Sequence, residues 1–184
     1  MGKLEVICGP MFSGKSEELL RRLKRAQIAK RSFQLYKPAI DNRYSETHVV
    51  THSGIDMPCR VINTAEELLA TPATVKIIAI DECQFLGEDT ASVIEALIQS
   101  GRRVIVAGLD MDYNGIPFDP MPQLLAMAES VLKVSAVCDV CGENATHTYR
   151  HSGTSNNKNR EPAVLVGATN HYEARCRKHW QNNK

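Results

Sequence analysis

The chain has 184 residues, enough for one full hydrophobic core or for one core with a small additional unit. Its 22 basic and 21 acidic residues give a net charge of +1, which provides no support for strong electrostatic binding of DNA or RNA. The sequence has no stretch of about 18 apolar residues and no N-terminal secretion signal, so we expect a cytoplasmic protein that does not enter a membrane.

Short apolar runs alternate with segments of helical pattern along the first part of the chain. The apolar runs are LEVIC (4–8), FQLY (33–36), VKIIAI (75–80) and RVIVAG (103–108). Nearly continuous apolar runs are typical of strands covered on both faces of a parallel sheet. Segments 16–30 and 89–100 predict helices, and Thr64 to Glu67 have the spacing of a capping box. The alternation predicts a three-layer α/β domain with a mainly parallel sheet over residues 1–135.

The first apolar run leads directly into GPMFSGKS, which has the spacing of a phosphate-binding loop. Its glycines permit a backbone whose N–H groups point at phosphate oxygens, and the following helix adds further donors. We predict that Lys15 reaches the terminal phosphates and that the Ser16 hydroxyl binds Mg²⁺. A chance match is the alternative, but the loop stands between a predicted strand and a predicted helix, as the motif requires. The predicted ATP- and phosphate-binding residues are Gly9, Pro10, Met11, Phe12, Ser13, Gly14, Lys15 and Ser16.

Two carboxylates follow the third apolar run, in the stretch IIAIDECQFL. Open α/β sheets bind their ligands at the carboxyl ends of the strands, which is where Asp81 and Glu82 are expected. We predict that Asp81 fixes Mg²⁺ through water and that Glu82 acts as a general base. A pair of solvated loop carboxylates is the alternative.

Three kinds of nucleotide chemistry are compatible with such a loop. A guanine-specific switch usually carries Asn-Lys-x-Asp, whereas the nearest match, Asn157 to Arg160, lacks the aspartate. A helicase-type motor needs a second motor domain or an oligomeric ring together with a nucleic-acid track, and the chain is too short to supply both. A kinase for a small acceptor needs only a base, a cation near the transferred group and a pocket. The sequence therefore favours a small-molecule kinase.

Four potential metal ligands form two pairs near the C-terminus, Cys138 with Cys141 and Cys176 with His179. Each such pair can hold one side of a tetrahedral Zn²⁺, as in a zinc ribbon, and four protein ligands leave no position for an activated water. The segment is too polar to build much of a core, so the metal is expected to hold it together. We predict a structural zinc site in a second domain, residues 136–184; four unrelated residues are the alternative.

The motifs GPMFSGKS and IDECQF and the two C-terminal ligand pairs together resemble the thymidine kinases of the cytosolic, zinc-containing type. The resemblance extends from Lys3 to about His179, and the order and spacing of three independent motifs make it specific. It implies a P-loop NTPase-like domain followed by a small zinc-ribbon domain with a lasso loop. It also implies ATP-dependent phosphorylation of the 5′-hydroxyl of thymidine, and of deoxyuridine, by a homotetramer that dTTP inhibits. A zinc-ribbon ATPase acting on nucleic acid is the alternative.

The resemblance assigns further roles by position. Arg43 in KPAIDNRY would stabilise the charge of the transferred phosphoryl group, and Asp41 beside it would contribute to the magnesium site. Without the resemblance, Arg43 would be read as a surface cation, and an aromatic residue beside a strand as part of the core. Gly167-Ala168 stands where the family commonly has Gly-Gly. The implied nucleoside-binding residues are Met11, Phe85, Leu109, Tyr113, Phe118, Val164, Val166, Gly167, Ala168 and Tyr172.

Overall fold

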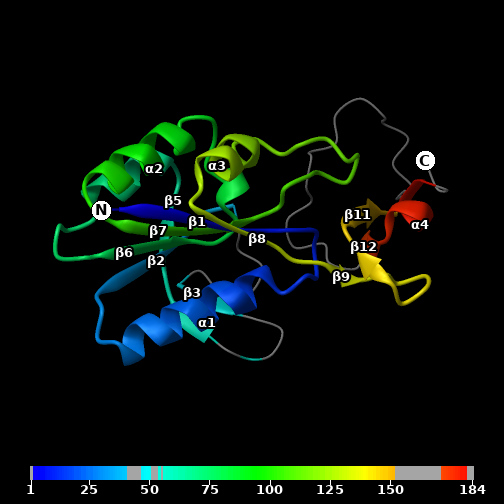
Figure 1. The fold of residues 1–184 in the computed structure, drawn as a ribbon, viewed down its shortest axis with the longest axis horizontal. Helices are drawn as coiled ribbons and strands as arrows, with labels where there is room; N and C mark the ends of the chain where they lie inside the picture. The colour runs from blue at the N-terminus through cyan, green and yellow to red at the C-terminus, as the bar shows by residue number, and fades with distance from the viewer. Residues whose placement is uncertain (1, 41–46, 51–53, 55, 152–170, 182–184) are drawn as a thin grey trace.

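The computed structural model describes residues 2–40, 47–50, 54, 56–151 and 171–181 of the chain. Figure 1 shows a central sheet between helices, with a smaller group of strands beyond one end of the sheet. The six strands of the sheet have the order β5-β2-β6-β7-β1-β8, and all neighbouring pairs are parallel. The predicted α/β class with a mainly parallel sheet is therefore confirmed.

The elements around the predicted apolar runs have the following bounds. The sheet consists of β1 (Lys3–Cys8), β2 (Phe33–Pro38), β5 (Arg60–Ile62), β6 (Ile77–Ile80), β7 (Arg103–Gly108) and β8 (Ser130–Lys133). The helices beside it are α1 (Lys15–Ile28), α2 (Thr90–Gln99) and α3 (Met121–Met127), with 3-10 turns η1 (Ala65–Ala70) and η2 (Cys83–Phe85). Helix α1 ends two residues before its predicted end because Lys30 adopts a left-handed backbone, with φ of 52°.

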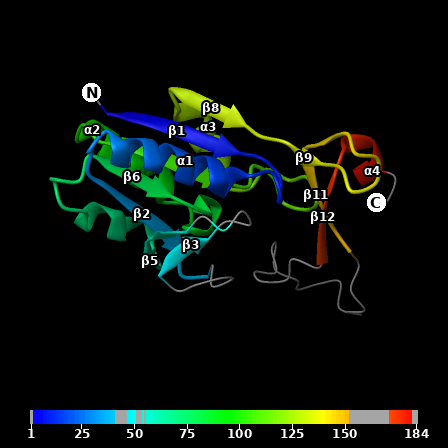
Figure 2. The ribbon, with the colours of Figure 1, turned by 90° about the horizontal axis from the view of Figure 1, so that it is seen from below.

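Shorter elements complete the described chain. An antiparallel pair, β3 (His48–Val50) and β4 (Asp56–Pro58), lies beside the sheet. The C-terminal group consists of β9 (Ala136–Val137), β10 (Asn144–Ala145), β11 (His147–Arg150), β12 (Tyr172–Arg175) and α4 (Arg177–Gln181). In Figures 1 and 2 this group lies beyond the carboxyl ends of the sheet strands. Among the helices in the described ranges, none is both long and apolar enough to cross a membrane.

Two apolar clusters cover the two faces of the sheet, because alternate strand residues point to opposite sides. Helix α1 packs Leu19, Leu20 and Leu23 against one face, which includes Ile105. Helices α2 and α3 cover the opposite face (Figure 1), where Leu97 is among the buried residues. Complete burial of each such side chain stabilises the fold by about 1.5–3 kcal/mol. Burial on both faces explains why the strands read as continuous apolar runs.

A charged group, Glu5, lies within β1 on the α1 side of the sheet and is only 5% exposed. Its Oε1 is 2.7 Å from Lys3 Nζ and from Arg103 Nε, and its Oε2 is 2.8 Å from Arg22 Nη1. Burial raises the pKa of this carboxyl, but the hydrogen bonds and charges of Arg103 and Lys3 outweigh it and bring the pKa to about 2. The ion pairs connect α1, β1 and β7.

We expect Glu5→Gln to lower the free energy of unfolding at neutral pH by about 3 kcal/mol. This is the stabilisation that corresponds to a pKa of Glu5 lowered from 4.5 to about 2 on folding, and the variant loses it. Because the folded pKa is depressed, this stability is present above pH 4.5 and is lost as the pH falls toward 2. The difference between the variant and wild type in urea denaturation should therefore shrink across that window. Glu95→Gln, on the exposed face of α2, is the control; a pH-independent difference for Glu5→Gln would contradict the assignment.

Candidate active site and metal cluster

The loop between β1 and α1 combines left-handed glycines with a lysine that folds back over it. Gly9 has φ of 149°, and Gly14, which caps α1, has φ of 79°. A Cβ on Gly9 would lie 2.3 Å from the carbonyl oxygen of Val134, so this close approach requires glycine. The ammonium of Lys15 donates to the carbonyl of Pro10 at 2.7 Å. A loop of this kind at the carboxyl end of an inner strand, followed by a helix N-terminus, is suited to phosphate.

The predicted magnesium ligands Ser16 and Asp81 contact each other directly. Ser16 lies in the first turn of α1, and Asp81 follows β6. The Ser16 hydroxyl donates to Asp81 Oδ2 at 2.8 Å, and the backbone N–H of Glu82 donates to Oδ1 at 3.1 Å. Mg²⁺ prefers oxygen ligands and is usually bound by one or two carboxylates together with waters and substrate phosphates. This donor set fits magnesium. The third predicted ligand, Asp41, lies outside the described residues.

Glu82, the predicted base, occupies the sharp turn between β6 and η2. Its φ of 50° and ψ of 40° place it in the left-handed region that non-glycine residues seldom adopt. The side chain is buried, and its Oε2 accepts a hydrogen bond from Nε2 of Gln84 at 2.6 Å. Sparsely populated backbone conformations of this kind persist where the surrounding structure holds them, and they cluster at functional sites.

Three of the predicted nucleoside-binding residues gather at the carboxyl ends of β6 and β7. The rings of Phe85 and Phe118 meet edge to face, with centroids 5.8 Å apart. Leu109 follows β7 and donates its backbone N–H to Oε1 of Gln84 at 3.0 Å. The same glutamine therefore joins Leu109 to Glu82.

The C-terminal group contacts the loops at the carboxyl ends of the sheet strands. The backbone N–H of Met11 donates to the hydroxyl of Thr148, in β11, at 3.1 Å. The indole N–H of Trp180, in α4, donates to the carbonyl of Tyr113 at 3.1 Å. The ring of Trp180 also packs on Gly115, where an added Cβ would lie 2.6 Å from the ring.

The remaining predicted aromatic residues are linked through the end of β11. The guanidinium of Arg150 lies over the ring of Tyr113, 4.9 Å from its centroid. Tyr172, which begins β12, is the register partner of Arg150 and is buried. Tyr113 and Tyr172 therefore both lie beside β11, the strand that also contains Thr148, the partner of Met11.

Arg43, the predicted phosphoryl-stabilising cation, lies outside the described residues. So do the lasso candidates Val164, Val166, Gly167 and Ala168. Their roles stay predictions.

Two buried polar residues of this site, Gln84 and Thr148, have no predicted role, although Gln84 stands within the motif IDECQF. They are 3% and 4% exposed, and buried polar groups require hydrogen-bond partners. For Gln84 the available signal was its place two residues after Glu82, at the end of a buried strand. Thr148 gave no signal, because its partner Met11 is 137 residues away in the sequence.

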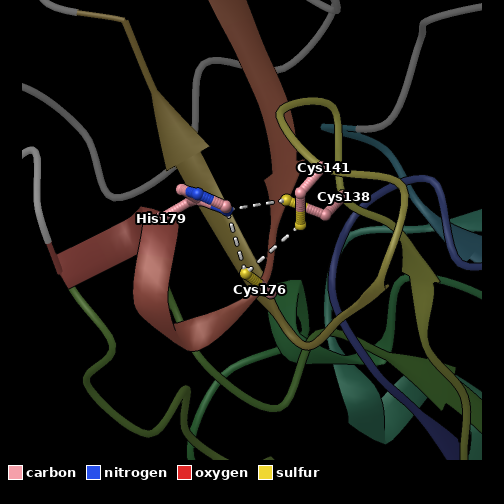
Figure 3. Close-up of side chains that lie close together, drawn as sticks. All are labelled: Cys138, Cys141, Cys176 and His179. Carbon is pink, nitrogen blue, oxygen red and sulfur yellow. Dashed lines mark hydrogen bonds between the residues drawn. The ribbon is translucent and has the colours of Figure 1, made fainter.

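The four predicted metal ligands converge at the C-terminal group (Figure 3). One ligand atom of each, from Cys138, Cys141, Cys176 and His179, lies within 4.8 Å of all the others. Sγ of Cys138 is 3.7 Å from Nδ1 of His179, and Sγ of Cys141 is 3.9 Å from Sγ of Cys176. Tetrahedral zinc with bonds of about 2.3 Å to sulfur holds sulfur ligands about 3.8 Å apart. The cluster therefore fits a closed zinc site, with Nδ1 of His179 as the fourth ligand.

The thiols divide into two kinds. Burial raises the pKa of Cys138, but backbone N–H groups of Cys176, Val140 and Cys141 lower it more strongly, to about 6, which favours the thiolate that binds metal. By contrast, burial raises the pKa of Cys83 to about 12. Cys8 is also buried and Cys59 half-buried, and neither belongs to the cluster.

Cys176→Ser should release zinc and destabilise the C-terminal group, because its own apolar cluster is small. The buried members of that cluster are Ala136, Cys138, Ala145 and Ala174. In small zinc-dependent units the metal supplies about 10 kcal/mol or more of folding free energy. Metal analysis and limited proteolysis should show zinc loss and new cleavage after residue 135. Cys59→Ser is the control; wild-type protein without stoichiometric zinc would contradict the site.

Comparison with known protein families agrees with this geometry. The family model described as thymidine kinase matches residues 2–180. The matched range includes the phosphate loop, both carboxylates after β6 and all four residues of the metal cluster. The family's chemistry is phosphoryl transfer to a nucleoside, so the protein is a kinase. The chain belongs to the thymidine kinase family.

Proposed function

We propose that the protein transfers the γ-phosphoryl group of ATP to the 5′-hydroxyl of thymidine, and of deoxyuridine, in nucleotide salvage. The observation that carries the proposal is the gathering of the Lys15 loop, the Ser16–Asp81 pair and Glu82 at one edge of the sheet. The family match supports a nucleoside as the acceptor. The resemblance further supports a homotetramer that dTTP, the end product, inhibits. The net charge of +1 supports a protein that does not bind nucleic acid, and the sequence of the N-terminal segment supports a cytoplasmic location.

In the proposed reaction, the 5′ oxygen forms a bond to the γ-phosphorus while the bond from that phosphorus to the bridging oxygen of ADP breaks. Glu82 accepts the hydroxyl proton, and Lys15 and Arg43 stabilise the charge of the transferred group. Ser16 and Asp81, with Asp41, would hold Mg²⁺, which neutralises phosphate charge when bound. Alignment and electrostatic stabilisation supply most of the rate.

The pyrimidine ring of the acceptor nucleoside would contact the aromatic and apolar residues at the carboxyl ends of β6 and β7. Phe85, Leu109 and Phe118 would form one side of this nucleoside site, and Met11, Tyr113 and Tyr172 would contact the nucleoside from beside β11 and β12. The lasso residues Val164, Val166, Gly167 and Ala168 would contact the pyrimidine edge through their backbone. We place the boundary between the two proposed domains near residue 135, between β8 and β9.

The test is to incubate the full-length protein with Mg·ATP and a panel of nucleosides and to separate the products. Thymidine and deoxyuridine should yield monophosphates. A thymidine analogue without the 5′-hydroxyl is the matched control and should yield none. ATP hydrolysis that DNA stimulates, with no nucleoside monophosphate formed, would overturn the proposal in favour of an ATPase acting on nucleic acid.

A further inference from the structure

We propose that Gln84 is a positioning residue that holds the carboxylate of Glu82 in the orientation in which it receives the substrate proton. The inference rests on the proposed function, in which Glu82 is the base. Gln84 lies in η2, is 3% exposed, and donates from Nε2 to Oε2 of Glu82 at 2.6 Å. Terminal carboxylate torsions have broad energy wells, so a fixed hydrogen bond selects one orientation.

The other end of the Gln84 amide is held as well, and this settles which end faces Glu82. Its Oε1 accepts the backbone N–H of Leu109 at 3.0 Å. A backbone N–H can only donate, so the amide oxygen must face Leu109 and the NH₂ group must face Glu82. The carboxylate therefore contacts a neutral donor.

The end of β7 leaves room for this amide. A Cβ on Gly108 would lie 2.7 Å from Oε1 of Gln84 and 2.9 Å from Sδ of Met121. Any larger residue at position 108 would displace the amide or the methionine. The glutamine side chain is thus held by packing as well as by hydrogen bonds at both ends.

A neutral donor on the carboxylate also suits a base. A hydrogen bond to the charged form favours ionisation, and only the ionised carboxylate can accept the proton of the hydroxyl. A glutamate at position 84 would still accept from Leu109 but would place a second carboxylate oxygen beside Oε2 of Glu82. An ionised carboxylate has no donor to offer and repels the like charge of Glu82, so the orienting hydrogen bond would be lost.

The experiment is therefore Gln84→Glu, with kcat and the KM values of thymidine and ATP measured at neutral pH. We expect kcat to fall by about 10- to 100-fold, because the carboxylate of Glu82 loses the donor that orients it. Both KM values should stay within a few-fold of wild type. Gln99→Glu is the matched control, because Gln99 donates to Glu95 at 2.9 Å on the exposed face of α2. Its kcat should be that of wild type.

Each result decides the inference. Unchanged kcat, or a fall in kcat accompanied by a comparable rise in both KM values, would overturn it, since a glutamine that only supports the shape of the site would affect binding as well as chemistry. If Gln84→Glu does not fold, Gln84→Met, which also lacks the donor, should show the same fall in kcat at unchanged KM, and a wild-type kcat would overturn the inference. Glu82→Gln distinguishes failure of the base assignment from failure of the positioning role. If that variant keeps its turnover, the base assignment itself fails. If it loses turnover while the Gln84 variants keep a wild-type kcat, only the positioning role fails.

Discussion

Turnover of thymidine should fall by about 10²- to 10⁴-fold in Glu82→Gln, because glutamine keeps the shape of the side chain but cannot accept a proton. This factor corresponds to about 3–5.5 kcal/mol of activation free energy. The amide can still hydrogen-bond to Gln84 through its oxygen, so the left-handed turn at position 82 should be retained. Thymidine and ATP should bind with nearly wild-type affinity. Rapid-quench measurement of product formation, together with calorimetric binding constants, separates the two effects.

Asp81→Asn is the informative comparison, because it removes charge from the neighbouring carboxylate. Since Asp81 bonds to Ser16, the proposed magnesium ligand on α1, its loss should weaken metal binding. Raised Mg²⁺ should therefore restore part of the turnover of Asp81→Asn and none of that of Glu82→Gln. Turnover within a few-fold of wild type in Glu82→Gln, or its recovery in excess Mg²⁺, would move the base elsewhere.

Lys15→Ala should lower turnover by about 10³-fold or more, since it removes a cation from the charge that develops on the transferred group. The ammonium bonds to the carbonyl of Pro10 within the loop, and Lys15 belongs to neither apolar cluster of the sheet. The melting temperature should therefore change little. Lys24→Ala, an exposed position of the same helix, is the control. Wild-type rates in Lys15→Ala with normal Mg·ATP would refute the phosphate-loop assignment.

The parts of the fold that were predictable are those whose signals are local. β1, β2, β6 and β7 were visible as apolar runs because both faces of each are covered. β8 was not, because all four of its residues are exposed and its place is set by pairing with β1, far away in the sequence. The capping box at Thr64 did form, but the turn it begins is a short 3-10 helix rather than an α-helix.

The site, too, has a part that local motifs predicted and a part that they did not. The spacing of motifs predicted that Ser16 would lie near Asp81 and that the four metal ligands would converge. Contacts made between motifs were not predictable, because neither Gln84 with Leu109 nor Met11 with Thr148 has a sequence pattern of its own. Such pairs depend on which strands end side by side and on how the C-terminal group packs against the sheet.

The packing of Trp180 on Gly115 has a spectroscopic consequence. Trp180 is the chain's only tryptophan, so all indole fluorescence arises at the junction between the sheet and the metal-binding group. The indole is buried and lies 4.6 Å, centroid to centroid, from the ring of His147. A red shift in emission would report detachment of the C-terminal group even while the helical circular dichroism of α1 and α2 is unchanged. Fluorescence and circular dichroism together can therefore distinguish opening of this junction from unfolding of the sheet.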